Sequence, residues 1–134
     1  MHNMQTLYCY VDGADNETIE PVLVDAFRTL TLDWAPFSAV LVNQVHERAP
    51  GMAPDDLSDW FIGLNLPLHH AGRAQITQLV LFIKALAGVT RRDFVVGISS
   101  ASGVSEDLIF LDANADESDA VRLCAKLQAA PHGA

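Results

Sequence analysis

Apolar residues recur at every third or fourth position in two stretches of the chain, which is the spacing of a helix that buries one stripe. In residues 17–31 these positions are Ile19, Val22, Leu23, Ala26, Phe27 and Leu30. In residues 73–87 they are Ile76, Leu79, Val80, Ile83 and Leu86. The pattern predicts a long helix in each stretch.

Each predicted helix lies between two segments with the character of β-strands. Residues 7–11 and 64–68 alternate as strands do, and they precede the first and the second helix. Segments with a strong β preference follow the helices at 38–47 and 93–100. Each half of the chain therefore has the order strand, helix, strand, which suits a right-handed crossover between parallel strands.

The two halves repeat this pattern at a constant spacing of 57 residues, at which Ile19, Val22, Leu23 and Ala26 correspond to Ile76, Leu79, Val80 and Ile83. Beyond the second half we expect a short strand at 108–111 and a last helix from about 116 to 127. Acidic residues from Asp116 to Asp119 favour the start of that helix, as caps and through the helix dipole.

These elements predict one α/β domain with a four-stranded core sheet, two long helices on one face, and a short C-terminal hairpin and helix. The first β-α-β unit is expected at 5–47 and the second at 60–100. An inter-repeat loop at 48–59 separates them, and residues 101–134 supply the C-terminal strand and helix. The strands are apolar on both sides, so both faces of the sheet should be covered, and oligomerisation would cover the second one.

The composition, 50% apolar and 19% charged over 134 residues, is that of a globular protein. The chain has no apolar run of the length that a membrane span needs and no secretory leader, so we expect a cytoplasmic protein that does not bind membranes. Cys9 and Cys124 are expected to be free thiols.

The net charge of −9 comes from 17 acidic and 8 basic residues. A nucleic-acid-binding protein needs a basic stripe, and Arg91-Arg92 is the only basic pair, so nucleic acid is not an expected partner. Two interpretations of the acidic excess stay open. It forms a solvated surface that aids solubility, or an acidic face for a basic partner.

Three short motifs in this framework resemble the tautomerase superfamily. They are "TLYCYV" at the start, Ala35-Pro36 before the second strand, and Ala71-Gly72-Arg73 at the start of the second long helix. The chain is similar to the fused-repeat branch that includes malonate semialdehyde decarboxylase, cis-3-chloroacrylic acid dehalogenase and macrophage migration inhibitory factor. The resemblance covers about residues 6 to 100, and together with the apolar strands it implies a homotrimer.

The resemblance also implies a catalytic amino-terminal proline, and this chain lacks one. The position that matches the proline is Thr6, whose nitrogen is an amide in mid-chain and has no basicity. Tautomerase and dehalogenase activity is therefore not expected. Any remaining activity would be isomerase- or lyase-type chemistry on small 2-oxo or unsaturated acids, with His70 rather than a proline as the acid–base group.

The residues that could bind a substrate are Arg73 and His70. Family members with dehalogenase-like sites carry two arginines around the Ala-Gly-Arg motif, and here His70 occupies the first of those positions. Arg73 in the first turn of a helix would favour a small carboxylate, because free backbone N–H groups point at that end. The alternative is that Arg73 is a surface residue paired with an acid.

No metal site and no cofactor is expected. His69 and His70 would point to opposite faces of a strand if the strand continued through them, and no CxxC or HExxH spacing occurs. Two hypotheses on function follow from the sequence. One is a tautomerase-like protein without its base that binds a small carboxylate, and the other is an acidic, non-enzymatic binding module, similar to immunity or inhibitor proteins, for a basic partner protein.

Overall fold

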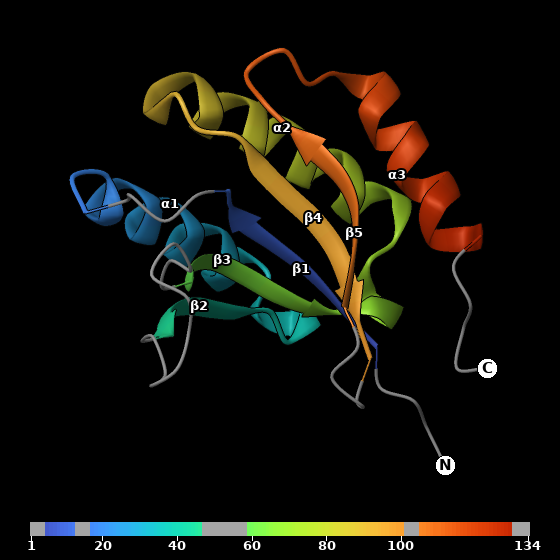
Figure 1. Ribbon diagram of the computed structural model, residues 1–134. Coiled ribbons are helices and arrows are strands. Elements are labelled where there is room, and N and C mark those ends of the chain that lie inside the picture. The colour runs from blue at the N-terminus through green and yellow to red at the C-terminus, as the bar shows by residue number, and fades with distance from the viewer. Residues whose placement is uncertain (1–4, 13–16, 47–58, 101–104, 130–134) are drawn as a thin grey trace, which may run out of the picture.

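The computed structural model describes residues 5–12, 17–46, 59–100 and 105–129 of the chain (Figure 1). The elements are, in order, β1 (Thr6–Val11), α1 (Glu20–Asp33), the 3-10 helix η1 (Ala35–Phe37), β2 (Val40–His46), β3 (Asp59–Pro67), the 3-10 helix η2 (Leu68–His70), α2 (Arg73–Thr90), β4 (Phe94–Ser99), β5 (Ser105–Leu111) and α3 (Glu117–Ala129). The predicted mixed α/β class is confirmed. The predicted loop at 48–59 lies almost wholly outside the described residues.

The sheet has five strands in the order β2-β3-β1-β4-β5, and every neighbouring pair is antiparallel. Consequently β1 and β2, which α1 connects, run parallel but have β3 between them. In the same way β1 lies between β3 and β4, which α2 connects. The first six main elements thus follow the split β-α-β arrangement, also called ferredoxin-like. β5 then extends the sheet by pairing with β4.

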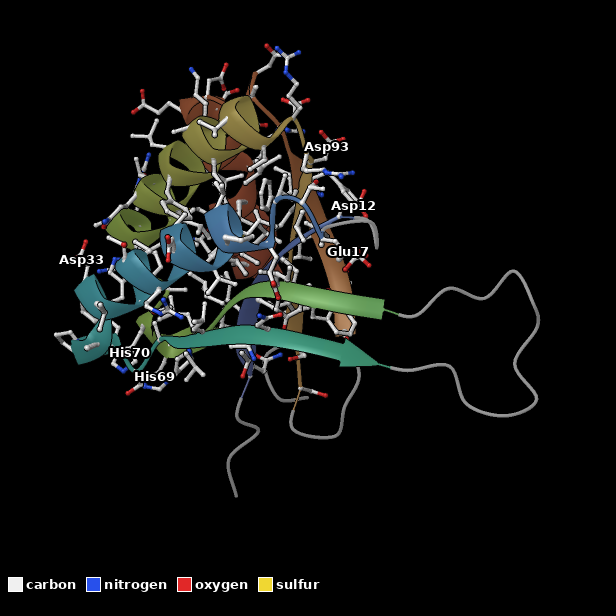
Figure 2. The ribbon with its side chains drawn as sticks, turned by 90° about the vertical axis from the view of Figure 1, so that its left-hand side faces the viewer. Asp12, Glu17, Asp33, His69, His70 and Asp93 are labelled. Carbon is white, nitrogen blue, oxygen red and sulfur yellow. The ribbon has the colours of Figure 1, made fainter. Side chains whose placement is uncertain are left out.

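All three helices lie on one face of the sheet (Figures 1 and 2), and a single core fills the space between the layers. From the central strand β1, alternate residues enter this core at Leu7, Cys9 and Val11, and all three are buried. Phe27 of α1 is fully buried there, with its ring centroid 6.0 Å from that of Phe94 in β4. The predicted apolar stripe of α2 is therefore buried, as are Leu23, Phe27 and Leu30 of the α1 stripe. Val22, also predicted for the α1 stripe, is instead 44% exposed.

The helix ends agree with local sequence signals. α1 starts three residues later than expected, at Glu20, with Pro21 in its first turn, where a missing N–H costs nothing. α2 ends at Thr90, and the next residue, Arg91, has the left-handed backbone conformation common after helices. At α3 the carboxylate of Asp116 accepts hydrogen bonds from the amide and hydroxyl of Ser118, which lower the pKa of Asp116. The predicted start of this helix is confirmed to within a residue.

Candidate functional site

The segment that carries the predicted binding residues forms a tight corner between β3 and α2. β3 ends at Pro67, which cannot donate a hydrogen bond to a sheet ladder, and η2 follows at once. The amide of Leu68 donates to the carbonyl of Gln5 at 2.9 Å, which fixes the corner beside the start of β1. Gly72 then precedes α2 without any side-chain cap. The first-turn N–H groups of α2 therefore lie at this corner.

The two histidines do not lie on a strand, so the condition under which they would point to opposite faces is not met. They belong to η2, and their ring centroids are only 4.1 Å apart. His70 also packs against Phe37 of η1, with 5.8 Å between the ring centroids. Figure 2 shows the pair at the opposite end of the molecule from Asp93 and Asp12, and no cluster of three metal-ligating side chains occurs among the described residues.

Arg73 is exposed and contributes to the wall of a small cavity of about 290 Å³. The cavity is lined by Leu68, Ala71, Gly72, Arg73, Cys124, Leu127 and Gln128. In the part of the chain that the structure describes, Arg73 forms no ion pair. Neither Thr6 nor His70 lines the cavity, so of the two predicted binding residues, Arg73 and His70, only Arg73 contributes to it. Residues of α3 complete the wall instead, which the sequence did not indicate.

Thr6, the position that matches the family's proline, is part of the sheet. It pairs with Pro67 on β3 and with Ser99 on β4. Side chains alternate along a strand, so Thr6 belongs to the same face as Tyr8 and Tyr10, away from the helices. It therefore lies on the other side of the sheet from the layer that holds Arg73.

The second functional candidate is the sheet face that carries no helix, hereafter the helix-free face. Its described side chains alternate with those of the core along each strand. They are Thr6, Tyr8 and Tyr10 of β1, Val40 and Val42 of β2, Phe61 and Asn65 of β3, Val95 and Ser99 of β4, and Ser105, Asp107 and Phe110 of β5. None of these is a lysine or an arginine.

Three aromatic rings form a row across this face, which we call the aromatic strip: Phe61, Tyr10 and Tyr8. The rings of Tyr8 and Tyr10 are stacked, with 5.1 Å between centroids and 12° between planes. The ring of Phe61 lies 5.2 Å from that of Tyr10 and is tilted by 51°. Tyr8 is buried, with 6% of its surface exposed, whereas Tyr10 and Phe61 are half-buried. The strip therefore leaves part of the ring surface of Tyr10 and Phe61 exposed.

Polar groups fix the two tyrosine hydroxyls. Tyr8 donates to Asp107 Oδ1 at 2.5 Å, and Tyr10 donates to Asn65 Oδ1 at 2.6 Å. Burial raises the pKa of Tyr8, and the hydrogen bond to Asp107 raises it further. Burial also raises the pKa of Tyr10, although the hydrogen bond to Asn65 opposes that effect. Both phenols thus keep their protons at neutral pH.

Glycines shape the strip. The site of a Cβ on Gly97 in β4 would lie 2.3 Å from the hydroxyl of Tyr8 and 2.3 Å from the carbonyl of Glu106. Only a residue without a side chain lets the Tyr8 ring cross β4 and reach Asp107 on β5. Sequence reasoning missed this face, although "TLYCYV" places both tyrosines opposite Leu7, Cys9 and Val11 in the strand alternation.

Comparisons with protein-family models, curated proteins and solved structures give no match to this chain. Among the described residues, none of the helices combines the length and the apolar character needed to cross a membrane.

Proposed function

We propose that the protein is a non-enzymatic binding module whose helix-free face docks a basic partner protein. The observation that carries this proposal is the combination of the aromatic strip, the exposed carboxylate of Asp107 and the lack of lysine and arginine at the described positions of the face. Aromatic residues that bury a large area at low entropic cost are the usual energetic centres of protein interfaces.

Apolar side chains beside the strip support the same function. Phe110 on β5 is 56% exposed, and Val40 on β2 is 58% exposed, although the solvated face of an antiparallel sheet normally carries polar side chains. The strip lies between them on the central strands. A partner on this face would cover large apolar side chains without any rearrangement of the core.

Charge favours a foreign partner over further copies of this chain. Two or three chains with a net charge of −9 each would repel one another. A basic partner would instead be attracted over a distance and would bind less tightly at high salt. The homotrimer expected from the sequence is the competing occupant of the face, and the oligomeric state distinguishes the two.

Selection from a displayed library of random peptides tests the proposal directly. We expect the full chain to enrich peptides with net positive charge, and we expect added salt to weaken their binding. Phe110→Lys should abolish the enrichment, because it replaces an exposed apolar side chain beside the strip with a cation that repels a basic peptide. Val121→Lys is the matched control, since Val121 on α3 is 51% exposed but belongs to the helix layer.

Two results would overturn the proposal. One is enrichment that survives Phe110→Lys and disappears with Val121→Lys, which would move the binding surface to the helix layer. The other is a trimer in light scattering that Phe110→Lys dissociates, which would assign the face to copies of this chain.

A second candidate function, binding of a small carboxylate, is favoured by the cavity at the start of α2. Arg73 and the free first-turn N–H groups are suited to an anion there. Titration with pyruvate and phenylpyruvate, followed by NMR, should shift the amides of Gly72 and Arg73, and Arg73→Ala should remove the shifts. Arg28→Ala is the control, because Arg28 is an exposed arginine on α1. Equal shifts in both variants, or keto–enol turnover that persists in Arg73→Ala, would exclude this site.

A further inference from the structure

The hydrogen-bonding capacity of the aromatic strip indicates what kind of side chain it recognises. A phenol has one hydrogen to donate, and Tyr8 and Tyr10 have already donated theirs to Asp107 and Asn65. Both phenolic oxygens can therefore only accept further hydrogen bonds. The exposed carboxylate of Asp107 is also an acceptor. A ligand that approaches these atoms must bring donors.

The rings add a second requirement. An aromatic face carries negative electrostatic potential and attracts a cation within about 6 Å of the ring centre. Tyr10, half-buried, lies between Tyr8 and Phe61, with centroid distances of 5.1 and 5.2 Å. Donors and positive charge together describe a guanidinium or an ammonium group.

Of these two cations, the guanidinium group of arginine fits better. It is planar, is weakly hydrated, stacks on aromatic rings, and presents five N–H donors in a fixed fork. An ammonium group is compact and strongly hydrated, so it loses more on leaving water for a half-buried aromatic surface. The strip offers ring surface beside acceptor oxygens. A guanidinium group can stack its plane on the ring and donate the N–H groups at its edge to the oxygens.

We propose that the aromatic strip binds an arginine side chain of the partner, with the guanidinium group against Tyr10 and its N–H groups directed to Asp107 and the phenolic oxygens. This inference rests on the proposed function, because it names the chemistry that the helix-free face selects in a basic partner. Nucleic acid is disfavoured on the same surface, because its phosphates would meet Asp107 without a lysine or arginine at the described positions of the face to compensate.

The test uses three eight-residue peptides that alternate glycine with arginine, lysine or glutamate, titrated into the full-length ¹⁵N-labelled chain. We expect the arginine peptide to bind about 3- to 10-fold more tightly than the lysine peptide at equal charge and salt. Its shifts should map to the amides of Tyr8, Tyr10 and Asp107. The glutamate peptide should not bind.

Variants separate the ring from the charge. Tyr10→Leu should remove the preference for arginine over lysine, whereas Tyr10→Phe, which keeps the ring, should retain it and so guards against a folding defect. Asp107→Asn should weaken both cationic peptides. The control Asp33→Asn removes the same charge from an exposed position at the end of α1 and should change neither affinity.

The outcomes are distinct from those of the display selection. Equal affinity for the arginine and lysine peptides, or a preference that survives Tyr10→Leu, would overturn the arginine inference and leave the binding module intact. Shifts confined to the acidic end at Asp12, Glu17 and Asp93 would also overturn it (Figure 2). Failure of the display selection on the helix-free face would overturn the module itself.

Discussion

The hydroxyl of Tyr8 donates a hydrogen bond to Asp107 Oδ1 at 2.5 Å and so joins β1 to β5, two strands that are not neighbours in the sheet. β4 lies between them, and the bond passes over Gly97. The contact connects residues 99 positions apart in the chain. It orients the Tyr8 ring against which Tyr10 stacks, and it places a carboxylate at the end of the aromatic strip.

Gly97→Ala should destabilise the fold by about 1–3 kcal/mol, because the added methyl group would overlap the Tyr8 hydroxyl and the Glu106 carbonyl. Urea denaturation measures the change. Gly88→Ala is the matched control: Gly88 is exposed on α2 and its nearest neighbour would be 4.0 Å from the new Cβ. That substitution should stabilise by about 0.5–1 kcal/mol, as expected for alanine in a helix. Equal changes in stability for Gly97→Ala and Gly88→Ala would contradict the close packing of Tyr8 over β4.

Tyr8→Phe should alter the dependence of stability on alkaline pH. The folded pKa of Tyr8 is raised, first by burial and then by Asp107, above the value of about 10 for an unfolded tyrosine. The native state therefore holds a proton that the unfolded state releases, so this contribution is complete below about pH 10 and is lost as pH rises through the folded pKa.

The measurement is the free energy of unfolding at several pH values from neutral to alkaline. Near pH 7 we expect Tyr8→Phe to be less stable than the wild type by about 1–2 kcal/mol, because a hydrogen bond to a carboxylate is lost. Above about pH 10 the difference in stability between wild type and variant should narrow. There the unfolded wild type releases the Tyr8 proton, which favours unfolding, and the variant has no such proton. A constant gap over the whole range would show that Tyr8 is not held protonated.

Phe27→Ala should cost about 3–5 kcal/mol, the usual range for a phenylalanine removed from a packed core. Phe27 is fully buried, and its ring packs edge-on against Phe82 of α2 at 5.3 Å between centroids. Leu32→Ala, on the same helix but 69% exposed, should stay within about 0.5 kcal/mol of the wild type. A similar loss of stability in the two variants would contradict the position of Phe27 on the buried side of α1.

The two cysteines should differ in reactivity. Cys9 is fully buried on the helix side of β1, and burial raises the pKa of its thiol, so little of the reactive thiolate is present. Cys124 on α3 is half-buried and lines the cavity beside Arg73. In the native protein a thiol reagent such as DTNB should label Cys124 first and Cys9 only on unfolding. If Cys9 in a native Cys124→Ala variant were labelled as fast as Cys124 is in the wild type, that result would contradict the position of Cys9 in the core.

The sequence predicted what depends on neighbours along the chain. Helical spacing in 73–87 located α2 from its first residue, and alternation at Leu7, Cys9 and Val11 identified the core side of β1. These signals are local, because a helix or strand that buries one side must repeat its apolar residues with its own period. For the same reason the start of α3 followed from Asp116 and its capping partners.

Strand order, by contrast, was decided by the tertiary structure. Alternation marks which side of a strand is buried but not which strand lies beside it, so the insertion of β3 between β1 and β2 left no trace in the pattern. The same limit applies to the sites. Tyr8 meets Asp107 only because β4 offers Gly97 between them, and Arg73 has Cys124 rather than Thr6 near its cavity because α3 packs against α2. Contacts between distant segments depend on the packing of the whole chain, which no local period encodes.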